Sequence, residues 1–315
     1  MIGVIFGVVI PYIAFAIFVV GVVYKLVYWA RSAVPLKIPT TSGQQKSLKF
    51  IKRTIYDRFD SPFTKWETIV RMILEIFAFR SLLKNTRYYL DRLSQRDARW
   101  LWLFAILFHY CLLLVLIRHT KFFFEPVPSF VEMLSELEAF KGVFIPSVYV
   151  SGVAIIVALL LLWFRRIFLS RERCISLPSD HFALILLLAI VISGNVMRYF
   201  IKVDISAVKG LLLSLMAFDI AKAIEFANSI EPMFYVHFAL GSFLLAYFPF
   251  SKLMHAGGIF FSPTRNMPNN NRAERHVNPW NPPYKGITWQ EYYEAYKDQL
   301  DEIAESGYKV KPEVI

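Results

Sequence analysis

Five long apolar stretches divide this chain and limit what it can fold into. A helix needs about 20 apolar residues to cross the hydrocarbon core of a bilayer, and each stretch is about that long. Hydrophobic residues make up 56% of the 315 residues and charged residues only 19%, which is little charge for a soluble protein. We therefore predict an all-α integral membrane protein, a multi-pass bundle of five transmembrane helices at residues 2–29, 100–119, 143–169, 181–200 and 232–255.

Basic residues set the predicted orientation of this bundle. Residues 30–99 carry fifteen Lys and Arg, whereas residues 118–142 carry three. Loops rich in Lys and Arg stay in the cytoplasm, so we place the N-terminus outside the cell membrane and the C-terminus in the cytoplasm. The first stretch lacks a basic start and a small-residue cleavage site, which favours a permanent span over a secretory signal. The net charge of +11 is then explained by cytoplasmic loops, and we expect no nucleic-acid partner.

These patterns divide the chain into four parts. A first transmembrane helix is followed by a basic cytoplasmic insertion, then by a region of four transmembrane helices, and last by a cytoplasmic tail. Their predicted bounds are residues 1–29, 30–99, 100–256 and 257–315.

The insertion and the tail each contain a predicted helix. In the insertion, Ser61 and Pro62 resemble a helix start, and apolar residues recur at helical spacing over residues 66–77. This amphipathic helix could lie on lipid, pack on the protein itself or receive a partner. In the tail, Thr288 and Glu291 form a capping-box pattern before a short helix. We interpret the tail as a docking arm for a soluble partner, with a disordered tail as the alternative.

Four histidines lie inside or at the ends of two predicted spans. His109 and His119 lie in the second span, and His237 and His255 in the fifth. An imidazole in hydrocarbon is costly without a partner, so such residues indicate function. Because the two spans are antiparallel, His119 pairs with His237 near the outer face, and His109 pairs with His255 toward the cytoplasm. A b-type haem iron takes two axial ligands, so we predict that each pair ligates one of two b haems. Packed histidines without a cofactor are the alternative.

The distance between the two histidines of the second span differs from the distance between those of the fifth, so the depths within each predicted pair match only in part. Ten residues of helix span about 15 Å and eighteen span about 27 Å, so we expect a kink at Pro249 in the fifth span. Cys111 and Cys174 are the only cysteines, which excludes an iron–sulfur cluster held by this chain alone and a covalently attached haem. We interpret His181 and His276 as ordinary surface residues.

Haem carboxylates need cationic partners, and basic residues collect near both predicted haems. The outer candidates are Arg118, Arg198 and Lys202, and the inner ones are Lys252, Arg165 and Arg166. The alternative is that these side chains only reach from the membrane to the interface.

The ligand spacings of ten and eighteen residues resemble the gamma (cytochrome b) subunit of respiratory nitrate reductases. That family has five spans, an outside N-terminus and two b haems on its second and fifth helices. The resemblance covers about residues 1–256. The long insertion and the extended tail depart from the nitrate enzyme. They are more similar to the membrane cytochrome b of the dissimilatory sulfite-reduction complex, the DsrM type, or to the cytochrome b of methanogen heterodisulfide reductase, and we favour the sulfite branch.

The resemblance implies a function in quinol-dependent electron transfer. Menaquinol would be oxidised near the outer face, and its electrons would pass through two b haems to a cytoplasmic iron–sulfur subunit in anaerobic sulfur respiration. Further membrane and extracytoplasmic subunits would share the complex. The resemblance also implies a quinol site beside the outer haem. The candidates are Lys141, twenty-two residues beyond His119, and Arg118, which stands where the nitrate family has glycine.

Three rival functions remain at this point. The chain could be the cytochrome b subunit of a nitrate or heterodisulfide reductase. It could be a transporter whose histidines relay protons. It could also be a membrane anchor subunit that binds no haem.

Overall fold

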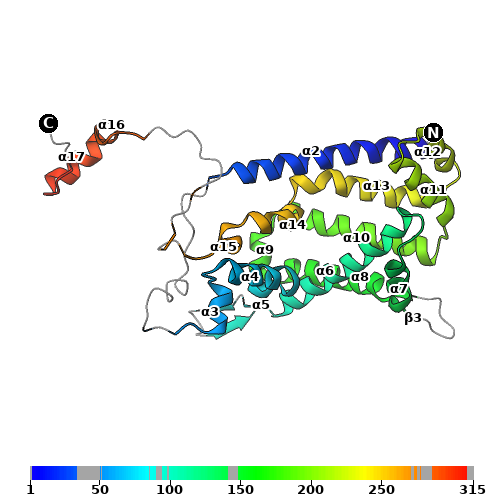
Figure 1. Ribbon diagram of the computed structural model, residues 1–315, viewed down its shortest axis with the longest axis horizontal. Coiled ribbons are helices and arrows are strands. Elements are labelled where there is room, and N and C mark those ends of the chain that lie inside the picture. The colour runs from blue at the N-terminus through cyan, green and yellow to red at the C-terminus, as the bar shows by residue number, and fades with distance from the viewer. Residues whose placement is uncertain are drawn as a thin grey trace.

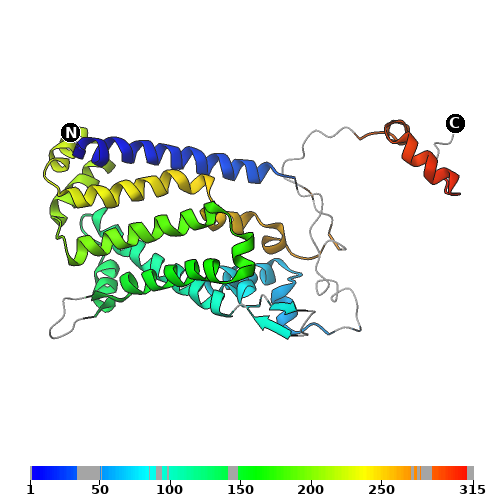
Figure 2. The ribbon, with the colours of Figure 1, turned by 180° about the vertical axis from the view of Figure 1, so that it is seen from behind.

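The computed structural model confirms a helical membrane protein with five candidate spans (Figures 1 and 2). It describes residues 2–33, 50, 52–84, 86–89, 94–97, 99–140, 148–270, 273–274, 277 and 286–310. Within this part of the chain, the helices long and apolar enough to cross a membrane are Ile2–Arg31, Arg99–Phe122, Val150–Phe168, Pro178–Tyr199 and Pro232–Phe250. Each matches one predicted span, although the third begins several residues later than predicted.

The five spans are built from α-helices, some of which continue into a π-helical or 3-10 turn. The first span joins α1 (Ile2–Val4), a π-helical turn (Ile5–Val9) and α2 (Ile10–Arg31). The others are α6 (Arg99–His119) with the 3-10 turn Thr120–Phe122, α8 (Val150–Phe168), α10 (Pro178–Tyr199) and α13 (Pro232–Tyr247). Helix α2 packs on α13, α13 on α10, α10 on α8, and α8 on α6 (Figure 1). The histidine-bearing helices α6 and α13 therefore pack chiefly on α8, α10 and α2 rather than on each other.

Short elements close the end of the bundle where the N-terminus lies, which we call the N-end (Figure 1). They are α7 (Ser129–Glu138), the hairpin of β3 (Ala139–Phe140) and β4 (Val148–Tyr149), α11 (Ile205–Met216) and α12 (Ile220–Ala227). Helix α12 approaches the first span so closely that a Cβ on Gly3 would lie 2.1 Å from the carbonyl oxygen of Ala227. The glycine therefore permits this contact. No helix was predicted between the fourth and fifth spans, where α11 and α12 lie.

The insertion folds at the opposite end of the bundle. It contains α3 (Ile55–Asp60), α4 (Lys65–Ala78), α5 (Arg80–Leu83) and the hairpin of β1 (Thr86–Tyr89) and β2 (Ser94–Asp97). The amphipathic helix is confirmed as α4, but its predicted start is wrong. Ser61 follows α3, and the N-cap of α4 is Thr64, whose hydroxyl accepts a bond from the Glu67 N–H. Thr64 and Glu67 form a capping box, which satisfies free N–H groups at the helix start.

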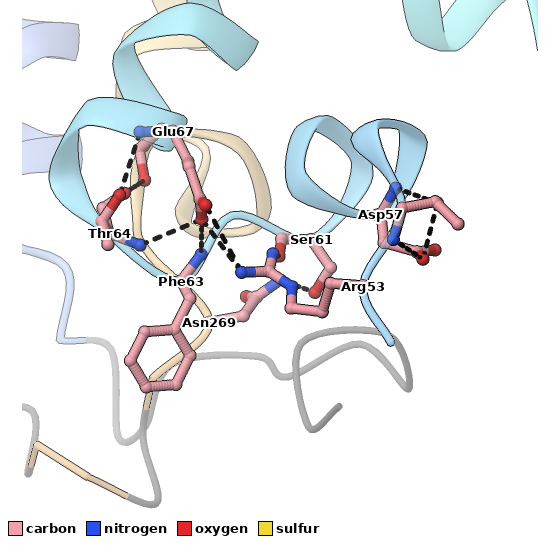
Figure 3. A network of polar contacts seen from close by, with 9 residues as sticks. Arg53, Asp57, Ser61, Phe63, Thr64, Glu67 and Asn269 are labelled. Atoms are coloured by element: carbon pink, nitrogen blue, oxygen red, sulfur yellow. Dashed lines mark hydrogen bonds and ion pairs between the residues drawn. The ribbon is translucent and has the colours of Figure 1, made fainter. Parts of the chain in front are cut away.

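The beginning of the tail packs on the insertion. Helix α15 (Pro263–Asn266) contacts α4, and the N–H of Asn269 donates to the carbonyl of Pro62 at 2.6 Å. The Asn269 amide also donates to the Ser61 hydroxyl at 2.8 Å, and the Arg53 guanidinium bridges the Ser61 carbonyl and Glu67 (Figure 3). We call α3, α4, α5 and α15 together the cap.

The fifth span ends before His255, so the predicted single helix to that residue is wrong. Helix α13 stops at Tyr247 and gives way to the 3-10 turns Phe248–Phe250 and Lys252–Met254, and His255 begins α14 (His255–Gly258). Pro249 explains this, because proline has no N–H to continue the helix. The chain then continues through the 3-10 turn Ile259–Phe261 into α15. The predicted kink is therefore a helix end.

The remaining elements lie in one loop and in the tail. Helix α9 (Ser170–Ile175) connects α8 and α10. The tail helix predicted after Thr288 is confirmed, with the capping box to Glu291, but it divides at Tyr296 into α16 (Trp289–Ala295) and α17 (Lys297–Glu305). Both views show α16 and α17 apart from the bundle (Figures 1 and 2).

Candidate functional site

The four predicted histidines come together in two pairs, and the partners are the ones that antiparallel spans require. The ring centres of His119 and His237 are 6.4 Å apart, with 26° between the ring planes. The ring centres of His109 and His255 are 6.0 Å apart, with 83° between the planes. We call the first the N-end pair and the second the cap-end pair. The early end of α13 brings His255 into its pair.

Three of the four rings are fixed through Nδ1 by a backbone carbonyl. His109 contacts the carbonyl of Ala105, and His119 that of Val115, each at 2.7 Å within α6. His255 contacts the carbonyl of Lys252 at 2.7 Å. A carbonyl only accepts a hydrogen bond, so Nδ1 carries the proton in each ring and Nε2 keeps a bare lone pair.

His237 reaches the same state through a serine. Its Nδ1 lies 2.9 Å from the hydroxyl of Ser193 in α10, and that hydroxyl donates its single proton to the carbonyl of Ile190. The Ser193 oxygen therefore accepts from Nδ1–H of His237. All four histidines thus offer Nε2 as a ligand, and the hydrogen bond at Nδ1 orients the ring and increases its basicity.

The separation of the rings fits one metal ion between each pair. With metal–nitrogen bonds of about 2 Å, two imidazoles on opposite sides of one ion have ring centres roughly 6 Å apart. Both pairs meet this condition. In the described part of the chain, no group of three or more His, Cys, Asp or Glu side chains gathers that could hold a metal ion. A bare zinc ion needs three or four protein ligands, whereas a haem iron needs two, so the donor set fits haem.

Aromatic and small residues shape the space around the rings. At the cap-end pair, the rings of Phe79 and Phe108 each lie edge-on to His109 at 4.9 Å. At the N-end pair, a Cβ added to Gly194 would lie 3.1 Å from Cε1 of His237. Gly194 therefore makes room for the ring, one residue beyond the serine that orients it.

The arginines predicted near the N-end pair make defined contacts. Arg118 is buried, with its Nε 2.9 Å from Glu138, its Nη2 2.9 Å from the Ser151 hydroxyl, and its guanidinium over the ring of Tyr149. Arg198 also lies over Tyr149, at 4.5 Å. Consecutive helix residues differ by about 100° in direction, so Arg118 faces α8 and not the face of His119.

The other predicted residues are placed as follows. Lys252 and Arg166 both pair with Asp180, and Arg165 pairs with Glu172, so each predicted inner cation has a partner within the protein. Lys202 is exposed beyond the end of α10, and His181 accepts a hydrogen bond from the Trp163 indole. Lys141 and His276 lie outside the described residues.

Comparison with known proteins agrees with this arrangement. The nitrate reductase gamma subunit family matches residues 91–269, which is more than half of the chain and includes all four paired histidines. The chain belongs to the nitrate reductase gamma subunit family. Like that family, it is a multi-pass membrane protein, as its five apolar helices show.

Two known proteins resemble the chain over nearly its whole length. Both are named Hdr-like menaquinol oxidoreductase cytochrome b-like subunit. The one from Archaeoglobus fulgidus is 74% identical over 99% of each chain. The one from Archaeoglobus profundus is 51% identical over 96% of each chain. Because both alignments cover nearly the whole chain, they include the insertion helices α3, α4 and α5 of the cap. These helices precede residue 91, where the match to the family begins.

Sequence analysis missed three residues that contact the histidines. Ser193 and Gly194 are adjacent small residues inside an apolar span, and a polar side chain at that depth is a usable signal. Phe79 gave no signal, because one more phenylalanine in a chain with 29 of them does not stand out.

Proposed function

We propose that this chain is the membrane cytochrome b subunit of a menaquinol oxidoreductase complex. The observation that carries the proposal is that hydrogen bonds at Nδ1 leave Nε2 available as a ligand in all four paired histidines, while the ring centres within the two pairs lie 6.0 and 6.4 Å apart. Family membership and the names of the two relatives support menaquinol as the electron donor. The chain's own role is electron transfer within a larger oxidoreductase.

In this proposal, each pair holds one b-type haem. A bound haem supplies the ability to accept and release one electron at a time. The protein fixes the ligand rings through the carbonyl and serine contacts, and its apolar spans set the dielectric around them. The bundle thus provides electron-carrying positions near both membrane faces.

The N-end pair is the proposed side of quinol oxidation. With the predicted outside N-terminus, His119 and His237 lie toward the outer face. Menaquinol bound there gives up two electrons and two protons and becomes menaquinone, and the protons leave on the outside. Each electron moved inward against 100 mV stores about 2.3 kcal/mol. Lys141 is a proposed quinol contact, and Arg118, held by Glu138, helps to position the wall of this site.

The electron acceptor is proposed to be a cytoplasmic iron–sulfur subunit of heterodisulfide-reductase type. Two surfaces suit its docking. On α4, Trp66 and Phe77 are 73% and 59% exposed and belong to an apolar stripe that faces away from the bundle. In the tail, the ring of Trp289 stacks on that of Tyr292, and the tilted ring of Tyr296 contacts Tyr292 at 4.9 Å. The terminal acceptor in this proposal is a sulfur compound, and further membrane and extracytoplasmic subunits complete the complex.

A haem count on the purified chain tests the proposal. Reduced-minus-oxidised visible spectra should give two b haems per chain for the wild type and one for His119→Ala. The variant should also lose reduction by a menaquinol analogue. His181→Ala is the matched control and should keep both haems, because His181 contacts Trp163 and neither pair. A folded wild-type chain that binds no haem when haem is supplied would refute the proposal.

A further inference from the structure

Helix α4 links the two chain segments that supply the cap-end pair. It packs against α15, which begins eight residues after His255. At its end, the Tyr110 hydroxyl and the Trp102 indole of α6 donate to the carbonyls of Phe77 and Ala78, at 2.9 and 2.8 Å. The next residue, Phe79, touches His109. Helix α4 therefore extends from the segment of one histidine ligand to the helix of the other.

The face of α4 that turns toward the protein is its polar one. Thr68 and Glu75 are 5% and 7% exposed, and Arg71 lies on the same side, one turn from each. The apolar side chains that are exposed lie on the opposite side of α4, and they are those of Trp66, Ile69, Val70, Ile73 and Phe77. A helix at the edge of a protein usually buries its apolar side. In α4 this arrangement is reversed, so the side that turns toward the protein presents polar and charged groups.

Two arginines, Arg71 in α4 and Arg80 at the start of α5, have buried N–H groups without acceptors in the described part of the chain. Among the described residues, Nε and Nη1 of Arg71 and Nη2 of Arg80 are buried and have no hydrogen-bond partner. Burial lowers the pKa of Arg71 from its ordinary value, and the nearby charges of Arg265 and Arg80 act in the same direction. A buried guanidinium with unmade hydrogen bonds is strongly unfavourable unless an anion completes it.

The carboxylates around these arginines are already engaged. Glu75 accepts from the N–H and the hydroxyl of Ser81, which lies in the following helix α5. Asp60 binds one nitrogen of Arg80 and also Lys84. The described residues thus place three arginines against these two carboxylates, and the local excess of positive charge calls for an added anion.

We propose that Arg71 and Arg80, with Arg265 beside them, bind the carboxylates of the haem that His109 and His255 hold. The inference rests on the proposed function, since it needs a haem at the cap-end pair. Arginine is suited to this role because its planar fork matches a carboxylate with two parallel hydrogen bonds. The cations that the sequence suggested for this end, Lys252, Arg165 and Arg166, are paired with Asp180 and Glu172 instead.

The reduction potential of each haem tests this assignment. Arg71→Gln and Arg80→Gln would be titrated by spectroelectrochemistry in detergent, together with wild type and the Arg173→Gln control. Arg173 is exposed in the α9 loop, so its variant loses the same charge away from the site. The potential that disappears in His255→Ala identifies the cap-end haem. Arg71→Lys keeps the positive charge but loses the planar guanidinium. It provides a second variant at this position if Arg71→Gln does not fold.

We expect the potential of the cap-end haem alone to fall. Oxidised haem carries one more positive charge than reduced haem, so removing a neighbouring cation favours the oxidised form. A tenfold change in the reduction equilibrium corresponds to 59 mV for one electron, and this is the expected size for each glutamine variant. Arg71→Lys should give a smaller fall, and Arg173→Gln none.

Two results would overturn the inference. In the first, Arg80→Gln and both Arg71 variants would bind two haems with unchanged reduction potentials. This result would show that the arginines do not contact the haem, and it would leave the proposed function intact. An equal fall in Arg173→Gln would show a general charge effect. A wild-type chain without haem would instead refute the proposed function itself, and this inference with it.

Discussion

The two histidine pairs have the same ligand chemistry but are built in different ways. The N-end pair comes from the regular helices α6 and α13, its rings are nearly parallel, and a third helix supplies Ser193 and Gly194. The cap-end pair joins a helical His109 to His255, which follows the end of α13, and its rings are nearly perpendicular. Phe79 from the insertion forms one of its walls.

The difference shows how one bundle can hold two sites with separate controls. Membrane-spanning helices alone define the N-end pair, so its geometry depends on helix packing within the bilayer. The cap-end pair also depends on α4, α5 and α15, which lie outside the five spans. A partner that docks on the cap can therefore act on the cap-end pair while the N-end pair stays unchanged.

The largest expected effect would break the N-end pair alone. Gly194→Val places a branched side chain where even a Cβ lies 3.1 Å from the His237 ring. The ring must move, so we expect loss of one haem per chain, with the cap-end haem retained, in visible spectra and haem quantification. Gly241→Ala on α13 is the control, since its added Cβ meets nothing within 4 Å. Retention of both haems in Gly194→Val would mean that His237 is not a ligand.

A smaller effect is expected at the cap-end pair, where a substitution in the cap should change one haem and leave the other unchanged. Phe79 has a left-handed backbone with φ of 49°, which costs about 1–2 kcal/mol for a residue with a side chain. Phe79→Gly removes this strain together with one of the aromatic rings that contact His109, while Phe108 stays in place. Water should then reach the cap-end haem and stabilise its oxidised form, which lowers its reduction potential.

Redox titration checks this prediction for both haems at once. Phe79→Leu, which keeps an apolar side chain of similar reach, should show a smaller fall. If the potential of the N-end haem fell by as much as that of the cap-end haem, the cap would not act on one pair alone.

The smallest expected effect concerns pH and the cap. Burial by itself would raise the pKa of Glu67, but N–H bonds from Phe63 and Thr64 and the Arg53 charge hold it below its ordinary value of 4.5. A carboxylate with a lowered folded pKa stabilises the fold above the unfolded pKa. That stability is lost as the pH falls through the folded value. The Arg53–Glu67 link should therefore weaken only below about pH 4.5.

Hydrogen exchange followed by mass spectrometry measures this change. Amides of residues 61–78 should exchange severalfold faster, relative to the intrinsic rate, as the pH falls from 5 to 3, and the spans should not change. Glu67→Gln should remove the pH dependence and exchange faster at both pH values. The same pH dependence in Glu67→Gln would assign the effect to another group.

The sequence by itself determined the membrane class, the five spans and the histidine partners. Hydrocarbon thickness fixes the length of a span, and antiparallel helices pair the outer residue of one with the outer residue of the other, so both features follow from spacing along the chain. The capping box at Thr288 was also readable, because it depends on residues three positions apart.

Only the tertiary structure decided how each pair is completed. The orienting hydroxyl of Ser193 comes from a different helix than His237, and the Phe79 wall comes from an insertion thirty residues before His109. The end of α13 at Tyr247 set the position of His255, and the inward polar face of α4 left Arg71 with unmade hydrogen bonds. These contacts join residues far apart in the chain, and no local periodicity encodes which distant side chain will fill a given space.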